Sequence, residues 1–129
     1  MKYQLFKVIQ NMAFRNADGK ILVLKHKTGK WLLPGGKINK GENWEEGLRR
    51  EVSEETGIKN FEPGQVFDID SWIDEKDGYY VVTFLVESSM KNIVLSDEHV
   101  EYAWIGREEL DKLDFWHEKI RKRVRKVLE

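Results

Sequence analysis

The sequence of 129 residues contains no cysteine and only two prolines, and its longest uninterrupted aliphatic run, residues 21–24, is too short to cross a bilayer. Without cysteine, disulfide scaffolds, thiolate-bound metal clusters and cysteine nucleophiles are excluded. The first seven residues also lack the apolar segment of a signal peptide. These absences predict a protein that does not span a membrane, and a reducing, cytoplasmic location fits them.

Charge of one sign is not in excess either, because 22 Lys and Arg residues face 23 Asp and Glu residues and give a formal net charge of −1. Any contact with a polyanion must therefore be local. Six cations do gather near the C-terminus, namely Lys119, Arg121, Lys122, Arg123, Arg125 and Lys126. We interpret them as the solvated face of an amphipathic helix whose apolar stripe contains Ile120, Val124 and Val127. The alternative is a contact with RNA.

With 40% hydrophobic residues, the chain can bury one core, and we expect one domain over residues 1–129. Strand-like runs occupy residues 3–14, 21–26, 66–73, 79–87 and 100–105, and the first two predict a hairpin. The run 79–86 is nearly all apolar and predicts a central strand that is buried on both faces. Helices are predicted mid-chain and at the C-terminus, so the order of elements favours an α/β fold with a mixed sheet between helices.

The mid-chain helix is predicted over residues 44–56, with Asn43 and Glu46 as a capping box and Gly57 as its end. At 100° per residue, Glu51, Glu54 and Glu55 share an arc of about 100° that borders the apolar stripe. Like charges at this spacing repel one another, more strongly near a core, and therefore need a cation. Oxygen ligands alone favour Mg²⁺, Mn²⁺ or Ca²⁺ over Zn²⁺. The alternative is a surface helix held by salt bridges.

Glycines lie in and before this helix. Gly47 falls within the acidic arc, where the absent side chain leaves room for an ion or reflects close packing. Upstream, Gly35 and Gly36 form a loop that can approach a ligand closely, and Lys37 follows at once. Together with Arg50, these groups form a phosphate-handling set. Neither a Walker A pattern nor a GxSxG elbow is present.

The spacing of these residues resembles the box of the Nudix hydrolase family, GX5EX7REUXEEXGU, in which U is aliphatic. Gly36 is followed after five residues by Glu42, and after seven more by the segment 50–58, which reads REVSEETGI. Every specified position agrees over Gly36–Ile58, and Gly47 departs from the alanine that the family usually carries. The resemblance implies an α/β/α sandwich with a mixed β-sheet between helices, and hydrolysis of a pyrophosphate bond in a nucleoside diphosphate linked to a group X.

The resemblance also implies roles for individual residues. Glu51, Glu54 and Glu55, with the carbonyl of Gly36, would hold Mg²⁺, with Mn²⁺ as an alternative. Arg50 would orient Glu51, and Glu42 would support the loop or an outer-shell water. The family varies in its general base, so Glu51, Glu54, Glu98 and Glu101 are all candidates.

Several residues are candidates for substrate binding. Gly35, Gly36 and Lys37 are expected at the phosphates, as are Lys25 and Lys27 at the end of the second strand. Aromatic residues could contact a base, namely Trp31, Trp72, Tyr79 and Tyr80, although packing beneath the glycine loop is the favoured role of Trp31. His26, His99 and His117 have no ligand spacing, and we predict that they are not catalytic.

The favoured function is hydrolysis of a nucleoside triphosphate to a monophosphate and pyrophosphate. One alternative is an ADP-ribose or other nucleotide-sugar pyrophosphatase. We rank it lower because members of that group often carry a proline downstream of the box, and no proline stands at the corresponding place near Ile73. Another is a non-catalytic module that binds nucleotides or RNA. The expected partner is a small nucleotide rather than a membrane, and the sequence leaves a homodimer open.

Overall fold

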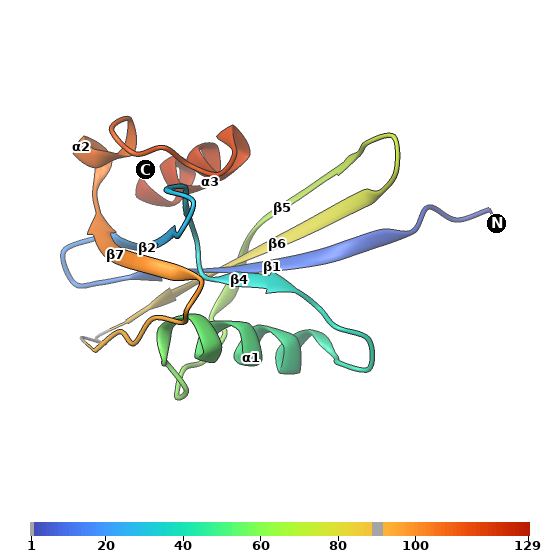
Figure 1. Ribbon diagram of the computed structural model, residues 1–129, viewed down its shortest axis with the longest axis horizontal. Coiled ribbons are helices and arrows are strands. Elements are labelled where there is room, and N and C mark those ends of the chain that lie inside the picture. Colours follow the sequence, from blue (N-terminus) through green and yellow to red (C-terminus); the bar gives the residue numbers. More distant parts are fainter. Residues whose placement is uncertain (1, 89–91) are drawn as a thin grey trace.

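Three layers make up the computed structural model, which describes residues 2–88 and 92–129 (Figure 1). Helix α1 (Trp44–Thr56) covers one face of a mixed sheet, while the short α2 (Arg107–Leu110) and α3 (Glu118–Leu128) cover the other. This arrangement confirms the predicted α/β/α sandwich. Among the described helices, none is both long and apolar enough to cross a membrane.

Within the described residues, the sheet contains seven strands: β1 (Phe6–Arg15), β2 (Ile21–His26), β3 (Trp31–Leu32), β4 (Gly35–Lys37), β5 (Gln65–Ile73), β6 (Gly78–Glu87) and β7 (His99–Ile105). Their order is β3-β2-β1-β6-β5, with β4 also paired to β1 and β7 to β2. The long β1 and β6 are parallel, and the other pairs are antiparallel. A mixed sheet is therefore confirmed.

The predicted hairpin of β1 and β2 is present only at its turn. The side chain of Asn16 accepts the backbone N–H groups of Asp18 and Lys20, at 3.0 Å each, and Arg15 is paired with Ile21. Beyond that pair the strands diverge, because β2 pairs with β7 and β3 while β1 pairs with β4 and β6. This divergence places β4 between β1 and α1, where the candidate site forms.

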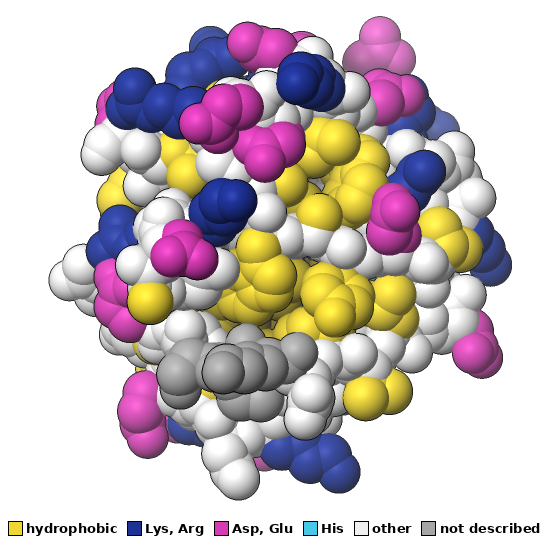
Figure 2. All heavy atoms as spheres, turned by 90° about the vertical axis from the view of Figure 1, so that its left-hand side faces the viewer, with side chains coloured by type: hydrophobic (Ala, Val, Ile, Leu, Met, Phe, Trp, Pro, Cys, Tyr) yellow, Lys and Arg dark blue, Asp and Glu magenta, His cyan; other side chains and the backbone are white. Residues whose placement is uncertain are grey.

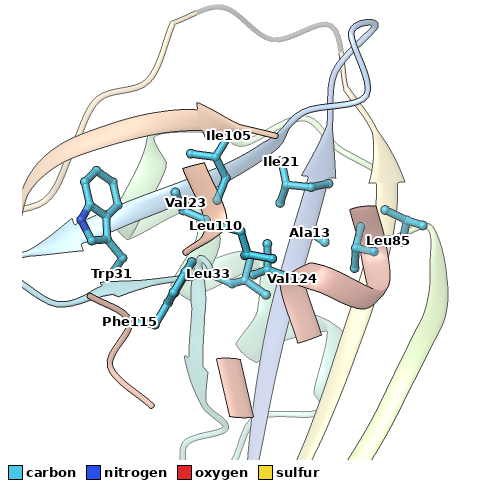
Figure 3. Close-up of a cluster of buried hydrophobic side chains, with 11 residues drawn as sticks. Ala13, Ile21, Val23, Trp31, Leu33, Leu85, Ile105, Leu110, Phe115 and Val124 are labelled. Atoms are coloured by element: carbon cyan, nitrogen blue, oxygen red, sulfur yellow. The ribbon is translucent and has the colours of Figure 1, made fainter. Parts of the chain in front are cut away.

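Two hydrophobic clusters fill the space between the layers, one on each face of the sheet. Alternate residues of β2 enter different clusters, with Val23 on the side of α2 and α3 and Leu24 on the side of α1. Figure 3 shows the first cluster, where Val124 of α3 lies beside Leu110 and Leu33. Figure 2 shows that hydrophobic side chains also gather at the centre of one outer face, with charged side chains around them.

The predicted burial of β6 on both faces holds for only half of the strand. Val81, Thr83, Phe84 and Leu85 are buried, whereas Tyr79, Tyr80, Val82 and Val86 are only half-buried. Of these four, Tyr79 lines an open cavity described below. The hydrophobic pattern alone did not separate these two environments.

Helix α1 begins and ends as its sequence predicts. The side chain of Asn43 accepts the N–H of Glu46 at 2.9 Å, and the side chain of Glu46 accepts the N–H of Asn43 at 3.0 Å. Gly57 ends the helix with a φ of 77°. A Cβ at Gly47 would lie 3.3 Å from Oε1 of Glu42 and 3.5 Å from Cγ1 of Ile38, so this position packs against the preceding loop rather than leaving room for an ion.

We predict that Asn43→Ala lowers the free energy of unfolding by about 1 kcal/mol, because the first turn of α1 loses a hydrogen-bond acceptor. Urea unfolding followed by circular dichroism measures the change. Asn39→Ala, in the preceding loop, is the matched control and is expected to change stability by less than about 0.5 kcal/mol. Equal losses in the two variants would show that the cap contributes nothing specific.

Candidate active site

Two adjacent glycines let β4 lie against both β1 and α1. Gly35 has a φ of 146°, and a Cβ there would lie 2.0 Å from the carbonyl oxygen of Gln10 on β1. A Cβ at Gly36 would lie 2.6 Å from Cδ of Glu51. Any side chain at these positions would displace the strand or the carboxylate, so the close approach of backbone to glutamate requires glycine.

Arg50 fixes the loop and one glutamate at the same time. Its Nε and Nη2 donate to the two carboxylate oxygens of Glu42, at 2.6 and 2.9 Å, and its Nη1 donates to Glu51 at 2.8 Å. Nη2 also donates to the carbonyl of Lys37 at 3.2 Å. The hydrogen bond from Arg50 lowers the pKa of Glu42 below its usual value. Arg50 is therefore in contact with Glu51, which it was expected to orient, and with Glu42 in the preceding loop.

Acidic side chains line a cavity of about 570 Å³ at the end of α1. Its lining consists of Glu51, Glu54, Glu55, Ser96, Asp97 and Glu98. Five of these six residues are acidic, and no Lys or Arg belongs to the lining among the residues that the structure describes. The loop before β7 supplies the second half of the set, which lies more than 40 residues from the helix in sequence.

Glu55 carries the clearest electrostatic signature of this crowding. Its carboxyl is buried and accepts the N–H of Gly35 at 2.8 Å. Burial, reinforced by the negative charges of Glu51, Glu98 and Glu54, raises the pKa of Glu55 to about 8, although the Gly35 hydrogen bond opposes the shift. A cation in the cavity would reverse this effect by favouring the ionised carboxylate.

The donor set of this cavity fits Mg²⁺. Its acidic ligands offer only oxygen atoms, as Mg²⁺ prefers. Among residues 2–88 and 92–129, no three acidic or histidine side chains already form a metal cage. Mg²⁺ sites commonly combine one or two carboxylates with waters and substrate phosphates. Glu51, Glu54, Glu55 and the carbonyl of Gly36 could therefore hold the ion together with a substrate.

A second cavity of about 480 Å³ adjoins the acidic one, and Glu55 and Glu98 line both. It lies between the sheet and the start of α3, and both aromatic and polar groups line it, including Asn11, Gly35, Gly36, Lys37, Trp72, Tyr79, Trp116 and three histidines. One end is thus acidic and the other aromatic. This combination can accept a molecule that has phosphates at one end and a flat ring at the other.

The remaining candidates for phosphate binding and for the general base lie in different places in the structure. Lys37 lines the aromatic cavity of about 480 Å³, but Lys25 and Glu101 do not line either one. These two residues are paired across β2 and β7, and the ammonium group of Lys25 lies 6.0 Å from the ring of Trp31. The backbone of Lys27 donates to the carbonyl of Glu98 at 2.9 Å.

The aromatic residues that were candidates for contact with a nucleobase also lie in different environments. Trp31 is only 7% exposed and belongs to the core, which confirms its predicted packing role. Trp72 and Tyr79 line the aromatic cavity, where their rings are stacked. Tyr80 contacts Phe6 instead and is absent from the cavity lining.

The basic C-terminal helix is largely engaged within the chain. Arg123 is only 5% exposed and lies between Asp68 and Asp70 of β5, at 3.9 and 3.7 Å. Lys126 pairs with Asp68 at 2.6 Å, and Lys119 with Asp70 at 3.9 Å. The interpretation as a wholly solvated face is therefore incomplete, because part of this face holds α3 against the sheet. The same pairing leaves fewer free cations for RNA.

Sequence reasoning missed the contribution of the histidines and Trp116 to the cavity. His26, His99 and His117 all line it, although they come from β2, β7 and the start of α3. His26 lies edge-on to both His99 and Trp116, with ring centroids 5.8 and 5.1 Å apart. No local spacing could reveal this cluster, since the pairing of β2 with β7 creates it.

Comparisons with known proteins agree with this geometry. A family model described as NUDIX domain matches residues 6–127. Nucleoside triphosphatase NudI of Salmonella paratyphi B is 33% identical over 96 residues, covering 67% of this chain and 68% of that protein. The MutT protein of Methanosarcina mazei Go1 aligns with a TM-score of 0.81 and 28% identity, covering 98% and 96% of the two chains. A MutT NUDIX hydrolase of Burkholderia pseudomallei gives 0.76 and 27%, covering 96% and 99%.

We predict that Glu55→Gln stabilises the protein in EDTA, and more so as the pH rises. The pKa of the Glu55 carboxyl is about 8 in the folded protein and about 4.5 in the unfolded chain. Between these two pH values the folded state binds a proton that the unfolded chain has released, so the free energy of unfolding of the wild type falls as the pH rises from 4.5 to 8. The gain of the variant over wild type should grow from near zero at pH 5 to on the order of 2 kcal/mol at pH 9.

Urea unfolding at the two pH values measures this difference. Glu62→Gln, at an exposed position, is the matched control and should show no such growth. A gain for Glu55→Gln that is the same at both pH values would contradict the assigned burial and charge crowding.

Proposed function

The chain is a pyrophosphohydrolase of the Nudix family, and we propose that it hydrolyses nucleoside triphosphates to a monophosphate and pyrophosphate with the help of Mg²⁺. The observation that carries this proposal is the junction of the two cavities at Glu55 and Glu98. A nucleoside in the aromatic cavity would direct its phosphates toward the carboxylates, where divalent cations offset the negative charge of both partners.

The box glutamates are the proposed metal ligands. Glu51, Glu54 and Glu55, with the carbonyl of Gly36, would hold Mg²⁺, which when bound neutralises phosphate charge and lowers the pKa of a water. Arg50 holds Glu51 in place by the 2.8 Å hydrogen bond and keeps the preceding loop closed through Glu42. Lys37 lines the aromatic cavity and would contact the phosphates from there.

Glu98 is our choice for the general base. It lines both cavities and therefore borders the space in which the phosphates and an attacking water would meet. Glu101 is less suitable, because it lines neither cavity. The proposed role of Glu98 is to accept a proton from the water as the water attacks phosphorus.

The relative that is named a nucleoside triphosphatase supports a triphosphate over the nucleotide-sugar alternative. A non-catalytic binding module is disfavoured, since all the box glutamates are present and three of them, Glu51, Glu54 and Glu55, line an open cavity. An RNA substrate is also disfavoured by the internal ion pairs of α3.

We predict that the purified protein with Mg²⁺ releases pyrophosphate and a monophosphate from at least one nucleoside triphosphate, and that Glu54→Gln lowers kcat by about 100-fold or more. Chromatography of the products from a panel of triphosphates and ADP-sugars measures both. Release of AMP and a sugar phosphate, with triphosphates left intact, would instead support the nucleotide-sugar alternative.

Glu45→Gln is the matched control, because Glu45 lies on the same helix and its side chain pairs with Arg49 outside the cavity. Its kcat should stay within about twofold of wild type, since surface substitutions have small effects. Wild-type turnover in Glu54→Gln would reject the assigned metal site.

A further inference from the structure

A third cavity, of about 300 Å³, lies between α3 and β5. Four cations and two carboxylates line it, namely Asp68, Asp70, Lys119, Lys122, Arg123 and Lys126. The cations recur at the spacing of one helix face, and the aspartates, two positions apart, share one face of β5. The lining has a surplus of two positive charges, which matches the charge of about −2 that a phosphate group carries near neutral pH.

Arg123 is the buried cation of this set. Its Nε and Nη2 face Asp68 and Asp70, which line the same cavity, at 3.9 and 3.7 Å. Both distances are too long for hydrogen bonds, and the guanidinium donates no other within the described part of the chain. Burial lowers the pKa of Arg123 below its usual value, although the charges of Asp70 and Asp68 oppose the shift. The aspartates therefore compensate the buried charge only in part, and donors remain for an acceptor in the cavity.

Two lysines at the cavity also have donors to offer. Lys122 is exposed and forms no ion pair with any residue that the structure describes. The ammonium group of Lys119 lies 3.9 Å from Asp70, again beyond hydrogen-bond distance. Lys126 differs, because it donates to Asp68 at 2.6 Å and offsets the charge of that carboxylate. The cations that can accept an additional anion are thus Lys119, Lys122 and Arg123.

Phosphate is the anion that suits this lining best. Its oxygens can accept from a guanidinium and from ammonium groups on different sides at the same time. A metal cation is disfavoured, since the positive groups outnumber the carboxylates. Lys119 and Arg123 also line the aromatic cavity, so the two cavities adjoin. A phosphate bound here would lie beside the aromatic cavity and not among the carboxylates at the end of α1.

We propose that Lys119, Lys122 and Arg123 form a second phosphate-binding site, separate from the acidic cavity. Its ligand is a phosphate group that is either free in solution or carried by a nucleotide in addition to its 5′-phosphates. The nucleotide-borne source rests on the proposed function, because it takes the nucleoside to occupy the adjoining aromatic cavity. The free source does not depend on that function.

The test is an NMR titration of the ¹⁵N-labelled protein with inorganic phosphate, in EDTA at constant ionic strength. Without divalent ions the acidic cavity repels phosphate. The amide signals of residues 119–126 should shift saturably, with a Kd on the order of 1 mM. Lys122→Gln should raise this Kd about tenfold, the value of one hydrogen bond between charged groups. Because Lys122 is exposed and unpaired in the described chain, this variant keeps the fold.

Arg125→Gln is the matched control, since Arg125 lies on the same helix and pairs with Asp111 outside the cavity. Its Kd for phosphate should stay within about twofold of wild type. Two results would overturn the assignment: no saturable shift in α3, or equal weakening in Lys122→Gln and Arg125→Gln, which would show only the general charge of the helix. The titration involves no hydrolysis, so failure of the proposed reaction leaves its outcome unchanged.

A second titration, with AMP and with adenosine 3′,5′-bisphosphate, distinguishes the two sources. If a nucleotide carries the phosphate, the bisphosphate should bind about tenfold more tightly than AMP, and Lys122→Gln should remove this advantage. If free phosphate is the ligand, the two nucleotides should bind equally, and saturating AMP should leave the Kd for phosphate unchanged. An advantage that Lys122→Gln retains in full would overturn the nucleotide-borne source. Binding of phosphate without binding of either nucleotide would support the site and contradict the proposed position of the nucleoside.

Discussion

Repulsion among carboxylates is the constraint on which the rest of this structure depends. Five acidic side chains from α1 and the loop before β7 surround one cavity, and Glu55 is buried where its charge is least favourable. A fold gains no stability from such crowding in the absence of cations. Divalent cations bound here would offset this repulsion, and the crowding therefore supports the proposal that a phosphate-bearing substrate binds through such ions.

The surrounding elements oppose this repulsion by packing, by backbone geometry and by ion pairs. Leu48 and Val52 are fully buried, so the hydrophobic face of α1 fixes the rotation of the helix and hence the direction of its glutamates. A Cβ at Gly35 would meet the backbone of β1, and one at Gly36 would meet the carboxylate of Glu51, so glycine is needed for this close approach. Arg50 then supplies a cationic contact to Glu42 and Glu51. Packing, backbone geometry and one guanidinium group together hold an unfavourable charge distribution.

The sequence was most informative where the determinants are local. The cap at Asn43, the end at Gly57 and the acidic arc follow from the helical period, and the layered fold follows from the order of the elements. The short β3 and β4 were not predicted, because strands of two or three residues have no periodicity to detect. Glu98 could be named as a candidate but not separated from Glu101, since only the tertiary structure shows which of them lines the cavity. For the same reason, the sequence did not predict the histidine cluster and the burial of Arg123, which depend on contacts between distant strands and helices.

The most direct test of the central claim is calorimetry of Mg²⁺ binding at pH 7 in two buffers that differ in ionisation enthalpy. With a pKa of about 8, Glu55 is mostly protonated before binding, so the account predicts release of close to one proton per ion bound. Binding without proton release, or no binding at all, would contradict it.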